Sequence, residues 1–148
     1  MTTQREIRNV ADNSSRVITV AAAITLDMQT HSGRIVYVTG ADRTITLPPA
    51  IGSGAHFTIV GGSADQGLTI DADGTDVFKG TCFAVDTDSA DNSEGFYAAA
   101  QTQISTNGTT SGGEYVGDVW EMVDVAAGIW WVKGRTTCTG TLVTPFAA

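Results

Sequence analysis

The feature that most constrains this chain is a series of short alternating runs, each closed by glycine, proline or aspartate. Residues 43–62, RTITLPPAIGSGAHFTIVGG, are the plainest example. Ile45 and Leu47 alternate with threonines, which predicts a strand with one buried face. The two prolines that follow fix the backbone and remove N–H donors, and the glycines let the chain reverse. The stretch is therefore predicted to form a strand, a rigid corner and a returning strand.

Similar runs continue on both sides of this corner. Residues 16–27, RVITVAAAITLD, are predicted to form one strand, because apolar side chains recur there at every second position. The segments 61–67, GGSADQG, and 72–76, ADGTD, have the spacing of hairpin turns. Residues 96–106, FYAAAQTQIST, fit either a short helix or a strand. The chain shows no long helical pattern and no internal repeat.

The whole pattern predicts an all-β fold. A chain of 148 residues suits one core. Many short strands joined by tight turns are typical of an antiparallel β-sandwich or jelly roll. We therefore expect a single domain over residues 16–148, preceded by an extended N-terminal arm over residues 1–15.

The first fifteen residues are polar and show no hydrophobic period. They fit two alternatives: a frayed terminus, or an arm that becomes ordered on a polar or acidic neighbour. Arg5 and Arg8 supply positive charge, while Ile7 and Val10 supply apolar anchors. In the second alternative these four residues form a binding arm.

Two stretches carry more apolar surface than one core needs. Adjacent Trp130 and Trp131 must point to opposite faces of a strand, so one fills the core and the other needs a loop or a partner chain over it. The run RIVYVTG is apolar on both faces, with Val36 and Val38 on one of them. Such a strand is buried on both sides or meets another subunit. We expect Val36, Val38 and one of the two tryptophans at a subunit interface.

Charge and hydropathy exclude two classes of partner. The net charge is -8, and nucleic-acid binding needs a basic surface instead. No apolar run approaches the roughly 20 residues of a membrane helix, and the N-terminus has no hydrophobic signal region. We expect no nucleic-acid partner and no membrane partner, and we expect the protein to be made in a cytosol.

Motifs for catalysis or metal binding are scarce. No G-x-S-x-G, P-loop or H-E-x-x-H occurs, and neither His31 nor His56 has a ligand at metal spacing. Asp71, Asp73 and Asp76 in DADGTD are the best oxygen ligands for Ca²⁺, but the loop does not fit an EF-hand and such residues commonly form turns. We expect no catalytic residue, no metal and no cofactor.

Cys82 and Cys138 are the only cysteines, which excludes a four-cysteine zinc site. In a reducing cytosol they are expected to be buried thiols. A disulfide between them stays an open alternative, because the sequence does not show whether they meet.

One long segment resembles a known class of proteins. RTITLPPAIGSGAHFTIVGGSADQGLTIDADGTDVFKG resembles a recurrent segment of bacteriophage structural proteins. There, a T-[IV]-T-L-P strand precedes G-x-x-[FY]-T-[IV]-[VI], an L-T-I strand and a D-x-[IV]-x-G turn. GDVWEMVDVAAGIWWVKG is similar to the closing hairpin of that pattern. The resemblance covers roughly residues 33–135, and the acidic loop at 86–94 departs from it.

This resemblance implies a non-catalytic virion protein. Capsid decoration (cement) proteins of this kind are β-sandwich or jelly-roll protomers, often homotrimers, that sit on the capsid surface, bind the major capsid protein and stabilise the shell. The N-terminal arm, with Arg5, Ile7, Arg8 and Val10, would contact that shell. Head and tail fibre proteins contain similar segments, so a fibre domain that binds a host surface receptor is the alternative.

Overall fold

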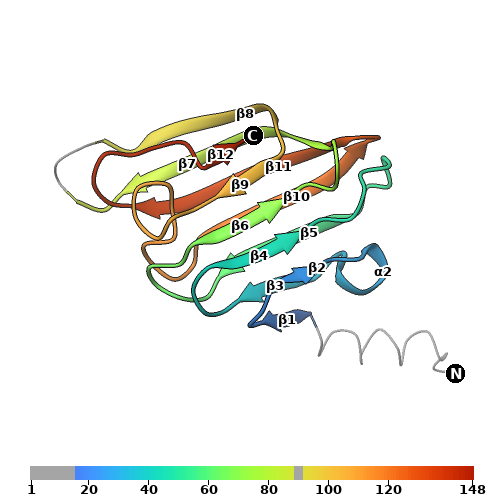
Figure 1. Cartoon of the computed structure of the whole chain (residues 1–148), viewed down its shortest axis with the longest axis horizontal. Helices are drawn as coiled ribbons and strands as arrows, with labels where there is room; N and C mark the ends of the chain where they lie inside the picture. The colour runs from blue at the N-terminus through green and yellow to red at the C-terminus, as the bar shows by residue number, and fades with distance from the viewer. Residues whose placement is uncertain (1–15, 89–91) are drawn as a thin grey trace, which may run out of the picture.

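The computed structural model describes residues 16–88 and 92–148, which contain two β-sheets and a single short helix, α2 (Met28–His31). The two sheets form two layers (Figure 1). The seven-stranded sheet has the order β1 (Val17–Val20), β3 (Ile35–Val38), β5 (His56–Gly61), β10 (Val119–Ala126), β11 (Ile129–Cys138), β7 (Val77–Asp86) and β8 (Glu94–Gln101). The five-stranded sheet has the order β12 (Phe146–Ala147), β9 (Gln103–Ser105), β6 (Leu68–Asp71), β4 (Arg43–Thr46) and β2 (Ile24–Thr25).

The all-β prediction is confirmed, but the antiparallel prediction is wrong. β1, β3 and β5 are parallel to one another, as are β2, β4 and β6, and β7 is parallel to β11. The remaining pairs are antiparallel. Turn signals in the sequence show where a strand ends. They do not show whether the next strand pairs with it or crosses to the other sheet.

The first six strands alternate between the two sheets and stack as coils (Figure 1). Each coil lies in register on the one before it, as in the pairs Val17 with Ile35 and Ile24 with Ile45. The predicted hairpins at 61–67 and 72–76 are therefore wrong, because both turns carry the chain across to the opposite sheet. The stretch 16–27 is also not one strand, since it bends at exposed alanines between β1 and β2.

The closing hairpin is confirmed. β10 and β11 are antiparallel around Ala126–Gly128, with a register shift between Asp124 and Ala126. This hairpin lies between β5 and β7 and so interrupts the stack of coils. The ambiguous run after residue 95 continues strand β8 and then forms β9.

Aromatic side chains of this hairpin fill the space between the sheets. Trp120 and Trp130 are fully buried, and the Phe57 and Trp130 rings lie 5.6 Å apart. Trp120 covers Gly134 so closely that a Cβ there would come 2.2 Å from the indole ring. The position of the Trp120 ring thus depends on the absence of a side chain at Gly134.

The corner at residues 48–54 is held by the carboxylate of Asp124. Its oxygens accept backbone N–H bonds from Ile51 at 3.1 Å, Gly52 at 2.7 Å and Ser53 at 2.9 Å. Ile45 and Leu47, just before the corner, are fully buried as predicted. The corner therefore joins the two sheets and is locked to β10.

Candidate functional site

The described titratable residues do not gather into a metal site. Across residues 16–88 and 92–148, no three His, Cys, Asp or Glu side chains gather where they could hold a metal ion. Two of the three candidate calcium ligands serve the fold, since Asp76 accepts the Ala50 N–H at 2.6 Å and Asp71 accepts the Gln103 amide at 2.7 Å. His31 is buried and its Nδ1 lies 3.1 Å from Asp27. In the same part of the chain, no helix is long and apolar enough to span a membrane.

The prediction of two buried thiols is confirmed. Cys82 and Cys138 are free, and both sulfur atoms lie beside the hydroxyl of Thr136, at 3.8 Å and 3.7 Å. Burial raises the pKa of the Cys82 thiol to about 12, and it also raises that of Cys138. Both groups are therefore protonated and poorly nucleophilic at neutral pH.

The most distinctive surface is the outer face of the seven-stranded sheet. Alternate side chains of its strands point away from the core. Register aligns them into rows across the sheet, and one row runs from Val17 on β1 to Tyr97 on β8. We call the following set the outer face: Val17, Ile35, Tyr37, Thr58, Lys79, Thr81, Phe83, Tyr97, Glu121, Val123, Trp131, Lys133 and Arg135.

Large apolar side chains on the outer face remain open to solvent. Trp131 is 41% exposed, Phe83 49% and Tyr97 74%. Val17 and Ile35 are exposed at the other end of the same sheet. Clusters of exposed aromatic and aliphatic side chains on a sheet commonly mark a protein-binding surface.

The outward face of the five-stranded sheet, on the opposite side of the molecule, is polar. The outward side chains of the five-stranded sheet are polar, and include Thr44, Thr46, Thr69, Gln103 and Ser105. Among the described strands, the large exposed apolar side chains are thus confined to the seven-stranded sheet.

Two shallow hollows lie on the outer face. One, of about 430 Å³, is lined by residues that include Phe83, Tyr97 and Lys133. The other, of about 200 Å³, is lined by residues that include Thr58, Val123 and Trp131. Aromatic rings and aliphatic stems form most of the walls, so these hollows suit side chains of another protein.

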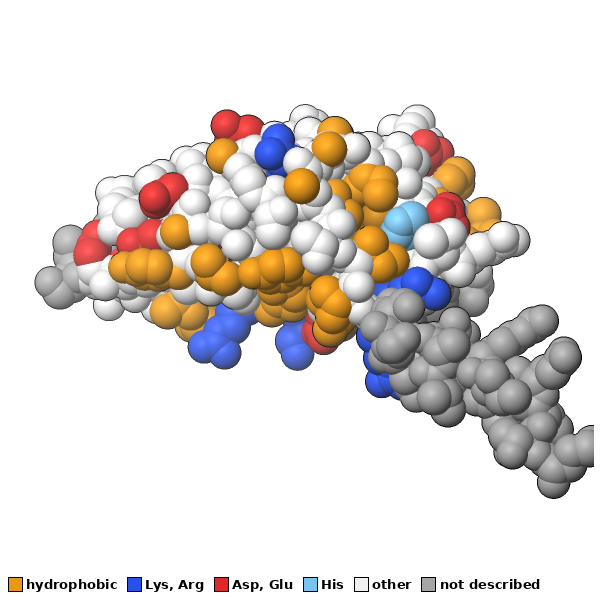
Figure 2. Space-filling view, turned by 90° about the horizontal axis from the view of Figure 1, so that it is seen from below, with side chains coloured by type: hydrophobic (Ala, Val, Ile, Leu, Met, Phe, Trp, Pro, Cys, Tyr) orange, Lys and Arg blue, Asp and Glu red, His pale blue; other side chains and the backbone are white. Residues whose placement is uncertain are grey.

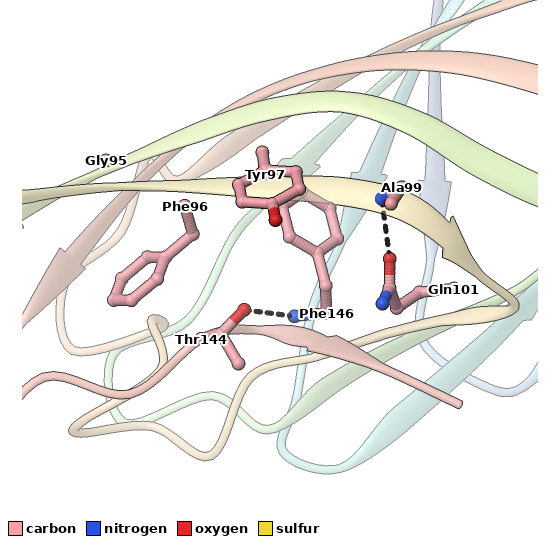
Figure 3. Close-up of a pocket in the computed structure, with 7 residues that line it drawn as sticks. All are labelled: Gly95, Phe96, Tyr97, Ala99, Gln101, Thr144 and Phe146. Atoms are coloured by element: carbon pink, nitrogen blue, oxygen red, sulfur yellow. Dashed lines mark hydrogen bonds between the residues drawn. The ribbon is translucent and has the colours of Figure 1, made fainter.

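A third hollow continues from the first around the edge of β8. Its volume is about 370 Å³, and Phe96, Tyr97, Thr144 and Phe146 line it (Figure 3). Gln101 accepts hydrogen bonds from the backbone N–H groups of Ala99 and Ala100, which covers part of this strand edge. Tyr97 stands between the two hollows and belongs to both.

The outer face is also the basic side of an acidic protein. Lys79, Lys133 and Arg135 are exposed there, on the neighbouring strands β7 and β11. Figure 2 shows Lys and Arg side chains projecting from the underside of the molecule, below a belt of hydrophobic side chains. In the described ranges the single ion pair joins His31 to Asp27, so none of these three cations forms a close ion pair there, although Glu121 lies opposite Lys133 in register.

The predicted interface residues are divided between core and surface. Val36, Val38 and Trp130 are fully buried inside the protomer. Trp131 points outward, as one of the two tryptophans must. On β3 the outward side chains are Ile35 and Tyr37, which are the ones available to a partner.

The predicted arm residues Arg5, Ile7, Arg8 and Val10 lie outside the described residues. The described chain begins at Arg16, directly before β1, which is an edge strand of the seven-stranded sheet.

Sequence reasoning missed the aromatic residues Phe83 and Tyr97. A signal for Phe83 was present, because it stands among the outward positions of the run VFKGTCFAV with Lys79 and Thr81. Tyr97 lay in the run that fitted either a helix or a strand, so its direction was not predictable.

The pKa values of two buried carboxyls next to this sheet, Asp124 and Asp118, are shifted in opposite directions. Burial raises the pKa of Asp124, but the hydrogen bonds from Ser53, Gly52 and Ile51 lower it by more, so the pKa lies below its ordinary value. Burial also raises the pKa of Asp118, and there the bonds from Thr137 and Gly113 do not compensate. Both carboxyls bind loop backbone to β10 and β11, which is a structural role.

Comparison with protein-family models, with curated proteins and with solved structures finds no match for this chain.

Proposed function

We propose that this protein is a non-catalytic structural component of a bacteriophage virion, which coats the capsid surface and stabilises the shell. The single observation that carries a docking role is the outer face, where exposed aromatic residues and exposed cations lie together on one sheet. The resemblance of residues 33–135 to phage structural segments supports the assignment to a virion.

In this proposal the two binding surfaces have separate tasks. The outer face contacts other copies in a homo-oligomer, which we expect to be a trimer. The N-terminal arm contacts the major capsid protein. Many weak contacts held by a closed oligomer give a high overall affinity, and binding to the assembled shell stabilises it by mass action.

A direct binding assay tests this function. Purified protein is added to capsids that lack it, and the bound fraction is measured by co-sedimentation. We expect saturable binding at a fixed ratio to the major capsid protein, and a higher temperature of shell disruption. A variant lacking residues 1–15 should keep its fold but bind more weakly. Full-strength binding by the truncated protein would contradict the role of the arm, and no binding by the whole chain would contradict coating.

The fibre domain remains a second candidate because of one observation. Among the described strands, β1 and β2 lie at the edges of their sheets, so the first described coil of the stack has no described strand beside it on that side. A fibre extends by adding coils or domains at such an end. This function predicts only a few copies in each particle and binding to host cells.

A further inference from the structure

We propose that copies of this protein associate through two unlike surfaces: a basic stripe on the outer face, and the acidic end of the next copy. The basic stripe is Lys79, Lys133 and Arg135. The acidic end is Asp88, Glu94 and Glu114, with Tyr115 and Val116 beside them. This inference rests on the proposed oligomer and names the contact that builds it.

The basic stripe has aromatic side chains on both sides. Lys79 pairs in register with Trp131, and Lys133 pairs with Thr81 on the neighbouring strand. Phe83 lies opposite Arg135 in the same register. The stripe thus combines positive charge with exposed aromatic rings, a composition enriched in protein interfaces.

A symmetric contact between two copies of this face is unfavourable. It would bring the three cations of both copies together, and the single acid among the outer-face residues, Glu121 opposite Lys133, offsets only part of their charge. Like charges brought together at an interface cost several kcal/mol. The stripe therefore needs an acidic surface of a different kind.

The acidic end provides that surface. Thr87 donates a hydrogen bond to Glu114, and Asp88 accepts bonds from Thr139 and Gly140, so three separate loops meet there. Figure 2 shows acidic side chains at several places on this view, including a group at the left end of the molecule.

Apolar residues at the acidic end complete the match. Tyr115 and Val116 are both exposed, and the Tyr115 backbone is fixed by a 3.1 Å bond to the Thr137 hydroxyl. Their side chains are of a size to enter the aromatic hollow of about 430 Å³ beside Lys133. The acidic end of one copy therefore matches the outer face of the next in two ways. Its carboxylates match the cations of the basic stripe, and its apolar side chains match the aromatic hollow.

Such a contact is directional. Each copy offers one stripe and one acidic end, which gives a heterologous interface. Heterologous contacts form a ring when the rotation between copies closes.

The test uses two charge-reversal variants of the whole chain. Lys133→Glu with Arg135→Glu alters the stripe, and Glu94→Lys with Glu114→Lys alters the acidic end. Molar mass is measured by light scattering across a range of concentrations. We expect the wild type to exceed the 15.4 kDa monomer at least twofold, and each variant alone to remain a folded monomer that unfolds in one cooperative transition.

Mixing the two variants separates a lost contact from a damaged fold. The unaltered acidic end of the first variant fits the unaltered stripe of the second, so the mixture should regain mass above the monomer. Asp73→Lys, an exposed turn residue outside both surfaces, is the matched control and should assemble as the wild type does. Raising the salt concentration should weaken wild-type assembly.

Three results would overturn the inference: a monomeric wild type, variants that assemble like the wild type, or a mixture that stays monomeric. These measurements use protein without capsids. Failure of this contact is therefore distinguishable from failure of capsid coating.

Discussion

Ser53 binds the carboxylate of Asp124 twice, through its backbone N–H at 2.9 Å and its hydroxyl at 2.7 Å. Together with the bonds from Ile51 and Gly52, this contact ties the corner after the two prolines to β10. The corner carries the chain from one sheet to the other, and these contacts fix the direction in which the chain leaves it. It contributes no reactive group.

Replacing Asp124 with alanine should strongly destabilise the fold. Three backbone N–H groups and one hydroxyl would lose their acceptor; because Ile51, Gly52 and Ser53 are exposed, water can replace it, and each lost bond should cost about 0.5–1.5 kcal/mol. We expect the free energy of unfolding to fall by about 3 kcal/mol, measured by urea denaturation. Ser53→Ala, the control, removes one of these donors and should cost about 1 kcal/mol. If Asp124→Ala and Ser53→Ala lowered the free energy of unfolding by the same amount, the corner would not depend on Asp124.

The acid titrations of Asp124 and Asp118 should move in opposite directions. The pKa of Asp124 is lowered by its hydrogen bonds despite burial, and that of Asp118 is raised by burial. We expect Asp124 to titrate below the ordinary value of 3.8 and Asp118 above it, as measured by carboxyl-carbon NMR. Titration of both at the ordinary value would contradict the structure around them.

The same shifts predict the pH dependence of stability. Asp124 contributes stability above its unfolded pKa, and this is lost as the pH falls through its lower folded pKa. Asp118 contributes below its unfolded pKa, and this is lost as the pH rises through its higher folded pKa. The difference in free energy of unfolding between the wild type and Asp124→Asn should therefore grow with pH across the acid range. The difference between the wild type and Asp118→Asn should shrink over the same range. If the free energy of unfolding depended on pH in the same way in both variants, the opposite pKa shifts of Asp124 and Asp118 would be refuted.

Gly134 should tolerate no side chain. A Cβ at this position would lie 2.2 Å from the Trp120 ring, whereas a Cβ at Gly95 would meet nothing within 4 Å. Gly134→Ala should lower the free energy of unfolding by about 1–3 kcal/mol through overpacking. Gly95→Ala, the matched strand control, should leave it within about 0.5 kcal/mol. Thermal unfolding of both variants checks this, and an unaffected Gly134→Ala would mean that Trp120 does not occupy the observed position.

Both thiols should be unreactive in the folded protein. Cys82 is buried and its thiol pKa is raised to about 12, and Cys138 is buried with a raised pKa. A chromogenic disulfide reagent should therefore label neither cysteine until denaturant is added, and should then label both. Rapid labelling of the native protein, or a failure to label after unfolding without a reductant, would contradict two buried free thiols.

The sequence predicted the local elements better than their pairing. Alternation identified the strands around Ile45 and Phe57, and both residues are buried as expected. The turn at 61–67 was predicted to form a hairpin but crosses between the sheets. Hairpin turns and crossing turns use the same glycine and aspartate residues, so the difference depends on long-range packing that no local pattern contains.

The candidate site was predictable only in part. Adjacent tryptophans must face opposite ways, so one ring was predicted to lie outside the core, under a loop or a partner chain; Trp131 is that residue, and it is 41% exposed. The direction of β3 was not predictable, because both of its faces are apolar, and the structure buries Val36 and Val38 while exposing Ile35. The basic stripe joins Lys79 to residues more than fifty positions later, through the parallel pairing of β7 with β11. That pairing has no signature in the sequence.

The most direct test of the central claim is the number of copies of this protein in each purified virus particle. Quantitative mass spectrometry can measure it against the major capsid protein. Capsid coating predicts a copy number comparable to that of the major capsid protein. A handful of copies would contradict coating and indicate a fibre or tail component, and complete absence from the particle would contradict any role in the virion.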